Sequence, residues 1–247
     1  MNVHRIFYTA NIKTKTLFIG FTNVILLIIT FKIFNYIRNE NKIKKHLKIY
    51  RNSRILLISG GPSIIQYFSE INKYDHIVLN SYQTLRNLDS TQIQAILDKT
   101  VLYYQAPFHE PLNLDDFKNN IEKMAEALQP KALIITDQKI QVTNSLRHKP
   151  LSYIHRFGFA TFRQTGFLTL LYLVLKSGIK EIDMLGVDLN YSILEMQKSR
   201  LDERPISELI SMESEVFYEI ESMFRFTLKS GIKVNNLNYD SLVKIYR

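Results

Sequence analysis

Six short aliphatic runs that alternate with helical patterns constrain the fold of this chain more than any other feature. The runs that predict strands are 55–59, 76–80, 101–105, 132–136, 181–188 and 233–237, and the windows that predict helices are 62–71, 89–98, 114–128, 164–177 and 207–229. The strand candidates show no alternation of apolar and polar residues, which is typical of strands buried on both faces. We therefore expect an α/β protein whose mostly parallel sheet is covered by helices on both faces.

A repeated pentapeptide, KSGIK, supports this alternation at 176–180 and again at 229–233. At each place a helical pattern ends in Lys-Ser and a strand pattern begins just after the glycine. Glycine is the residue that most readily takes the left-handed conformation with which many helices end. The repeat therefore predicts two similar helix-to-strand junctions, with Gly178 and Gly231 in that conformation.

The charge of the chain is concentrated near its amino terminus. Residues 1–53 hold ten of the 32 Lys/Arg and one of the 23 Asp/Glu, which leaves 22 of each sign for residues 54–247. The larger part of the chain is thus neutral overall and offers no net positive field to a polyanion. This distribution argues against a nucleic-acid partner.

An uncharged segment, residues 16–31, lies within the basic part and predicts an N-terminal transmembrane or membrane-associated helix. It is apolar enough to cross a bilayer if Lys32 reaches the headgroups, or to lie on an anionic leaflet as an amphipathic helix. Basic residues are more numerous after it than before it, which places the following domain in the cytoplasm. We expect residues 1–53 to be an anchor and basic linker, and residues 54–247 to be one domain that stays soluble without them.

Polar residues follow several predicted strands at their carboxyl ends, where parallel sheets bind ligands. Gly60, Gly61 and Ser63 follow the first strand, Asn80 follows the second, and Asp188 follows the fifth. The glycines let the backbone approach a ligand, although the same residues also suit an ordinary strand-to-helix turn. Asp188 is read either as a ligand to a sugar hydroxyl or as a cap for the next turn.

The segment that begins at Gln164-Thr165-Gly166 opens a helix too apolar to be exposed. The N-terminus of such a helix presents free N–H groups and a positive dipole end to an anion. Thr165 is therefore read as a phosphate contact, as an N-cap, or as both.

These motifs, taken in order, resemble glycosyltransferase family 42. The resemblance rests on Gly60-Gly61-Pro62-Ser63, on Asn80 and on the block HRFGFATFRQTGFLTLLYLVLKSGIKEIDMLGVDL at 155–189, and it covers roughly residues 54–244. Members are bacterial sialyltransferases that use CMP-sialic acid to cap lipooligosaccharide. The resemblance implies a Rossmann-like fold of the GT-A type, no metal, a membrane-associating segment and a location at the bacterial inner membrane. It also implies a set of residues around the CMP-sugar donor: Gly61, Ser63, Asn80, Thr165, Gly166 and Asp188. Gly60, in the same loop as Gly61, is a further candidate for this site.

The chain also departs from the family pattern. Gly60 and Tyr104 stand where the family usually has asparagines, and Asn190 stands near a family tyrosine, with Tyr191 next to it. The family's proposed base is a histidine before the last long helix, and this chain has no histidine after His155. Transfer to a hydroxyl still requires a group that accepts its proton.

Candidate catalytic residues are therefore Tyr191, for the leaving phosphate, and Glu213, for the proton. A carboxylate serves as a base when it is partly desolvated. Glu215 lies in the same segment, and both acids also fit the solvated face near a helix N-terminus.

Three other functions remain open at this point. One is transfer of another CMP-activated acid sugar such as Kdo to a cell-surface glycan, with the same nucleotide site. Another is a pterin pyrophosphokinase-like enzyme, which would need carboxylates for Mg²⁺ beyond Asp188. The third is a membrane-tethered nucleotide-binding protein that keeps the fold and lacks transferase activity.

Overall fold

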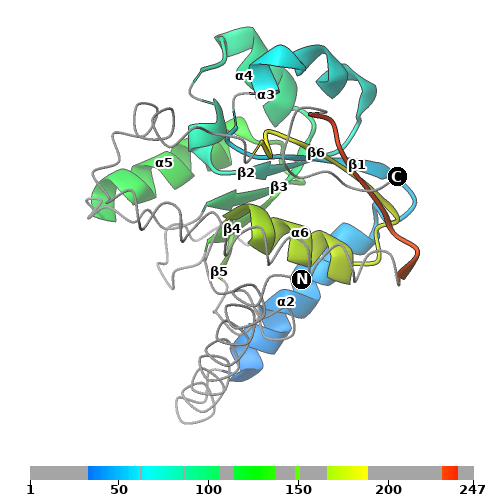
Figure 1. The fold of residues 1–247 in the computed structure, drawn as a ribbon. Coiled ribbons are helices and arrows are strands. Elements are labelled where there is room, and N and C mark those ends of the chain that lie inside the picture. Colours follow the sequence, from blue (N-terminus) through cyan, green and yellow to red (C-terminus); the bar gives the residue numbers. More distant parts are fainter. Residues whose placement is uncertain are drawn as a thin grey trace, which may run out of the picture.

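The structure, a computed structural model, describes residues 33–61, 63–85, 87–105, 114–136, 148–150, 166–188 and 230–238. Its centre is a parallel sheet of seven strands in the order β5-β4-β3-β2-β1-β6-β7 (Figure 1). The strands are β1 (Arg54–Ile58), β2 (Ile77–Asn80), β3 (Thr100–Gln105), β4 (Leu133–Thr136), β5 (His148–Pro150), β6 (Glu181–Leu185) and β7 (Lys233–Asn236). The predicted parallel α/β arrangement is confirmed, and all six predicted strands are present.

Helices cover both faces of the sheet, as expected for a Rossmann-like fold. They are α2 (Ile33–Lys48), α3 (Ser63–Gln66), α4 (Ser90–Leu97), α5 (Leu114–Ala127) and α6 (Gly166–Lys176), with the 3-10 turns η1 (Phe68–Lys73) and η2 (Tyr82–Leu85). One core cluster joins α2 and α6 to one face of the sheet. The other joins α3, η1, α4 and α5 to the opposite face, and Figure 1 shows α6 and α3 on the two sides.

Helix α6 is the centre of its layer. Every residue from Gly166 to Leu175 is buried, and only Lys176 at its end is exposed. Burial between the sheet and α2 explains why the sequence of α6, apolar apart from Thr169 and the terminal Lys176, shows no polar stripe. The expectation of a central helix in this segment is confirmed.

The two KSGIK junctions are built alike, as the repeat predicts. Gly178 has φ +78° and Gly231 has φ +65°. The amide of Gly178 donates to the carbonyl of Leu175 at 3.2 Å, which closes the last turn of α6. β6 and β7 begin within three residues of these glycines and pair with each other in parallel.

Helix α2 is packed against the folded core over its carboxyl-terminal part. Ile43 and Leu47 are completely buried and belong to the same core cluster as α6, with Tyr50 packed beside them. The compact part of the chain therefore begins no later than Ile43. Residues 1–53 were expected to be an anchor and linker outside the folded domain, so this expectation is wrong for the part from Ile43 onward. Whether earlier residues form an anchor stays a prediction.

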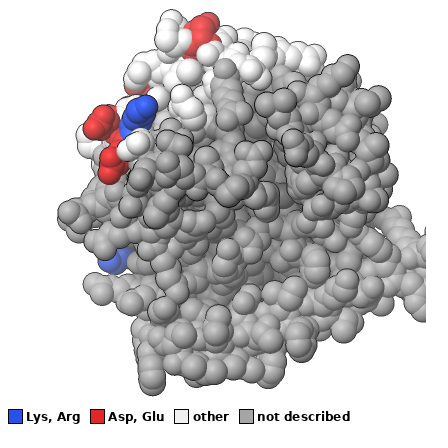
Figure 2. Space-filling model, turned by 90° about the vertical axis from the view of Figure 1, so that its left-hand side faces the viewer, with Lys and Arg blue, Asp and Glu red and all other residues white. Residues whose placement is uncertain are grey.

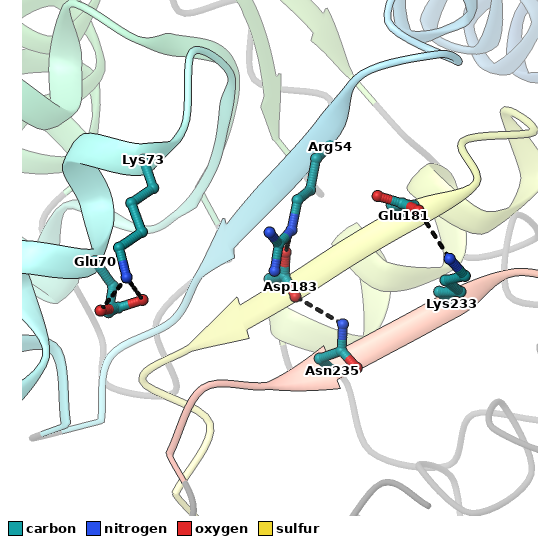
Figure 3. Close-up of polar contacts among 7 residues, drawn as sticks. All are labelled: Arg54, Glu70, Lys73, Glu181, Asp183, Lys233 and Asn235. Carbon is teal, nitrogen blue, oxygen red and sulfur yellow. Dashed lines mark hydrogen bonds and ion pairs between the residues drawn. The ribbon is translucent and has the colours of Figure 1, made fainter. Parts of the chain in front are cut away.

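A buried carboxylate ties three neighbouring strands together (Figure 3). Asp183 of β6 is inaccessible to solvent, accepts a hydrogen bond and ion pair from Arg54 of β1, and accepts a second bond from Asn235 Nδ2 of β7 at 2.9 Å. Charge-assisted bonds of this kind compensate the desolvation of a buried charge. Burial, followed by the charge of Asp183, raises the pKa of the neighbouring Tyr74, which keeps this phenol protonated.

The structure differs from the sequence-based expectation at two strands. β5, which pairs with β4 at the sheet edge, was not predicted. The strand expected over 181–188 ends at Leu185, because Gly186 has φ +76° and leaves the extended conformation.

No helix within the described residues is long and apolar enough to cross a membrane. The apolar segment 16–31 lies outside those residues, so its predicted association with a membrane is a matter for experiment.

Candidate functional site at the carboxyl edge of the sheet

The strand order of the sheet reverses between β1 and β6, which lie side by side although β2 to β5 follow β1 in the chain. Ligands of open α/β sheets bind beside such a reversal, at the carboxyl ends of the strands. Here the first of these ends carries Ser59, Gly60 and Gly61, and the second carries Gly186 and Asp188.

The two loops at this point are locked together by backbone contacts. Ser59 N–H donates to the Leu185 carbonyl at 2.8 Å, and Gly61 N–H donates to the Gly186 carbonyl at 2.9 Å. A Cβ atom on Gly61 would lie 2.6 Å from the Gly186 carbonyl oxygen and 2.4 Å from Asp188 Oδ2. Glycine at position 61 is therefore required by packing within the protein itself.

Asp188 and Ser63 are both engaged inside the fold. Asp188 is 2% exposed, and its carboxylate accepts hydrogen bonds from Ser63 N–H at 2.9 Å and from Asn238 Nδ2 at 2.7 Å. Ser63 Oγ in turn accepts a bond from Gly186 N–H at 3.1 Å. These bonds favour the interpretation of Asp188 as a cap. It holds together the segments that follow β1, β6 and β7, and so positions the loops of the site.

The hydrogen bonds of the Asp188 carboxylate predict how the substitution Asp188→Asn affects stability. We expect this change to lower the free energy of unfolding by about 1 to 3 kcal/mol, because one accepting oxygen becomes a donor that faces the Ser63 or Asn238 N–H. Denaturant unfolding measures the loss, and Asp75→Asn, at an exposed aspartate, is the matched control. A variant as stable as the wild type that binds nucleotide more weakly would instead give Asp188 a direct contact to the ligand.

Asn80, at the end of β2, has a side-chain amide that is only partly hydrogen-bonded. Its Nδ2 donates to Ser59 Oγ at 3.3 Å. Its Oδ1 is buried, and among the described residues it is the buried side-chain atom that has no hydrogen-bond partner. A Cβ atom on Gly166 would lie 2.1 Å from this oxygen, so glycine at the start of α6 admits Asn80 to the amino end of that helix.

An unpartnered buried acceptor is costly, by about 1 to 3 kcal/mol. Such an atom is satisfied when a ligand brings a donor to it. Gly166 also places the first backbone N–H groups of α6 beside the same point, where they attract an anion. This edge of the sheet thus combines a hydrogen-bond acceptor, Asn80 Oδ1, with helix N–H groups that attract negative charge.

Gln105, at the end of β3, holds the loop that follows Asn80. It is buried, its Oε1 accepts from the Tyr103 hydroxyl and from Tyr82 N–H at 3.3 Å, and its Nε2 donates to Ser81 Oγ at 3.5 Å. Burial raises the pKa of Tyr103, so the phenol stays protonated and remains a donor.

The contacts of Gln105 fix a strained residue next to the site. Ser81 has φ +67°, a left-handed conformation that costs a serine about 1 kcal/mol or more. A polar residue at the end of β3 was visible in the sequence, but its role in holding Ser81 was not.

Tyr104 occupies the position where the family pattern has an asparagine. It is fully buried, pairs with Asn80 in the register of β2 and β3, and would lie 2.9 Å from a Cβ on Gly166. Its ring therefore fills space beneath the start of α6. Gly60, at the other departure, has only Thr84 Oγ1 near its Cβ direction, at 3.7 Å, so there is room for a side chain.

Three predicted site residues lie outside the described residues: Thr165, Tyr191 and Glu213. The described ones, Gly60, Gly61, Ser63, Asn80, Gly166 and Asp188, come together at the carboxyl edge. Within the described part of the chain no three His, Asp or Glu side chains are grouped so as to hold a metal ion. The expectation that the protein uses no metal stays a prediction.

The surface charge of one side of the molecule is seen in Figure 2, which faces the left-hand side of Figure 1. Among the described side chains visible there, acidic and basic groups lie side by side at the upper left, and a further acidic and a further basic group lie apart from them.

Comparison with protein-family models, with curated proteins and with solved structures finds no match for this chain. The function therefore has to be argued from the residues at the site.

Proposed function

We propose that this chain is a membrane-associated bacterial glycosyltransferase. It moves sialic acid, or a related acid sugar such as Kdo, from a CMP-sugar donor to a lipooligosaccharide or another cell-surface glycan. The observation that carries this proposal is the buried, unpartnered Oδ1 of Asn80 beside Gly166, at the sheet edge where the strand order reverses. Resemblance to glycosyltransferase family 42 supplies the donor class, and Asn80 and Gly166 are among the residues that carry it.

In the proposed complex the CMP phosphate lies at the amino end of α6. The helix has eleven residues, and its dipole and free N–H groups stabilise the negative charge that grows as CMP leaves. Asn80 Oδ1 accepts a hydrogen bond from a hydroxyl or amino group of the donor. Gly61 keeps the loop after β1 close to β6, so a ligand reaches the sheet edge itself.

Two further residues are assigned to the transfer reaction itself. The attacking hydroxyl must lose a proton as the bond to the sugar forms, and Glu213 is the proposed base. Tyr191 is proposed to hydrogen-bond the leaving phosphate. Asp188 is given a positioning role, since its carboxylate is bonded to Ser63 and Asn238.

The apolar segment 16–31 is proposed to hold the enzyme at the inner face of the bacterial inner membrane. Glycolipid acceptors lie in that membrane, so an anchored enzyme samples them in two dimensions. The basic residues after the segment favour the cytoplasmic side.

A turnover assay tests the proposal directly. The full-length protein, kept in detergent, is incubated with CMP-sialic acid, CMP-Kdo, a UDP-sugar and a GDP-sugar, and release of the nucleotide is measured with and without glycolipid. We expect CMP release from at least one CMP-sugar, accelerated by the glycolipid. CMP binding without any release would favour a nucleotide-binding protein that lacks transferase activity, and release from only UDP- or GDP-sugars would contradict the family assignment.

A further inference from the structure

Helix α2 presents two opposite faces in its described carboxyl-terminal part. Ile43 and Leu47, four residues apart, are completely buried against the core. Lys42 and Lys45 are exposed, and Ile49, four residues after Lys45, is 75% exposed. At 100° per residue Lys42 and Lys45 lie on the side of the helix opposite Ile43 and Leu47, and Ile49 follows directly after the last helical residue, Lys48.

The exposed side carries three lysines and no acidic residue over 41–53. The third of these lysines, exposed Lys48, lies three residues after Lys45. None of the ion pairs formed between described residues involves Lys42, Lys45 or Lys48. We call the group formed by Lys42, Lys45, Lys48 and Ile49 the basic face of α2.

The lysines alone fit an ordinary solvated face, and a single exposed isoleucine is common on protein surfaces. The feature that favours a membrane is that the lysines and the exposed isoleucine lie next to one another. Ile49 is 75% exposed, and transfer of its apolar side chain from water into an apolar environment is favourable. The combination of cations with an apolar residue suits an interface in which lysines reach headgroups and the apolar group enters the acyl boundary. A nucleic acid would not offer Ile49 an apolar environment.

The position of the helix in the chain points to the same partner. The uncharged segment 16–31 precedes α2 directly, and the helix leads straight into β1 through the turn at 49–53. In Figure 1 α2 leans away from the sheet toward its amino-terminal end. Its core-facing and outward-facing sides are opposite, so a membrane that contacts the outward side does not compete with packing against the domain.

We propose that the basic face of α2 docks on an anionic lipid bilayer and thereby fixes the orientation of the folded domain at the membrane. This surface goes beyond the proposed activity and does not depend on it. It differs from the anchor because it belongs to a helix whose other side is part of the core. Each lysine near an anionic surface strengthens binding about fivefold, so three lysines together contribute on the order of 100-fold.

The test compares partitioning of the full-length protein into anionic and neutral vesicles. Sedimentation with phosphatidylcholine vesicles, with and without about a third of phosphatidylglycerol, gives the ratio of the two partition coefficients. The segment 16–31 contributes to both coefficients, so the ratio reports mainly on charge. The test variant is Lys42→Gln/Lys45→Gln/Lys48→Gln, and the control is Lys123→Gln/Lys131→Gln/Lys180→Gln, which removes three exposed lysines elsewhere.

We expect the test variant to lose most of the preference for anionic vesicles, on the order of 100-fold, while the control keeps it. Ile49→Gln is expected to weaken binding to both kinds of vesicle. An unchanged ratio in the test variant, or an equal loss in the control, would overturn the proposal. The salt dependence of the wild-type ratio is an independent check, since it should fall steeply between low and physiological ionic strength.

This test is separate from that of the proposed function. All substitutions lie on exposed positions, and glutamine has nearly the helix propensity of lysine, so thermal unfolding should be unchanged. A protein that binds no CMP can still show the vesicle preference, and an active enzyme can lack it.

Discussion

Leu47→Ala is expected to lower the free energy of unfolding by about 2 to 5 kcal/mol. The side chain is completely buried in the core cluster that joins α2 and α6 to the sheet, and its loss leaves a cavity. The effect of deleting residues 1–53 should be larger still, because Ile43 and Tyr50 are removed as well. Two buried aliphatic side chains represent about 4 to 10 kcal/mol, which is comparable to the whole stability of a domain.

Two control variants distinguish the effect of lost packing on stability from the effect of shortening the chain. Ile49→Ala lies two residues further along and is 75% exposed, so its stability should stay within about 0.5 kcal/mol of the wild type. Deletion of residues 1–32 leaves α2 in place and should preserve the cooperative unfolding transition. If the protein without residues 1–53 melted at the same temperature as the one without residues 1–32, the packing of α2 would not contribute to stability.

Gly186→Ala is expected to destabilise the protein by about 3 kcal/mol or more. The residue has φ +76°, which costs an L-residue about 1 to 2 kcal/mol, and a Cβ atom would lie 2.1 Å from the Ser59 carbonyl oxygen. Backbone atoms cannot move aside as a flexible side chain can. The loops after β1 and β6 would separate, so nucleotide binding should fall together with stability.

Gly178→Ala provides the control for the backbone term alone. Gly178 has φ +78°, and among the described atoms none lies within 4 Å of the position of its Cβ. This variant should lose only about 1 to 2 kcal/mol. Urea unfolding of both variants gives the difference, and equal losses would show that the close contact with Ser59 is relaxed without cost.

The central strands could be predicted because they are dense aliphatic runs that a sheet covered on both faces requires, and β7, with the sequence KVNN, could be predicted from the KSGIK junction before it. β5 could not be predicted in this way. It has three residues, His148–Pro150, and it pairs only with β4 at the edge, where a proline is tolerated. A segment that contributes so little apolar area leaves no pattern to detect.

The packing of α2 left a signal that the charge obscured. Ile43, Leu47 and Tyr50 follow the spacing of one helix face. The abundance of lysine around them favoured the interpretation of a basic linker. The lysines lie on the outer side of α2, and their presence is compatible with burial of the other side of the helix.

The candidate site was predictable at the level of strand ends, because parallel strands bring their carboxyl ends to one edge. The division of roles was not predictable. Ser63 and Asp188 are 125 residues apart and bond to each other, which a sequence does not reveal. The same is true of the contact between Asn80 and Gly166, which depends on where α6 packs on β2 and β3.

The central claim, that a CMP-type nucleotide binds where Asn80 meets the start of α6, is tested most directly by calorimetric titration. Wild type and Asn80→Asp are titrated with CMP, UDP and GDP. Aspartate keeps the size of Asn80, and its charge repels a phosphate. The Ser59 hydroxyl, which accepts from Asn80 Nδ2, can donate to the carboxylate instead, and the dipole of α6 offsets the cost of burying its charge. We expect the wild type to prefer CMP by at least tenfold, and Asn80→Asp to lose at least tenfold in CMP affinity with an unchanged melting temperature. Equal affinity for the three nucleotides, or CMP affinity unaffected by the substitution, would contradict the account.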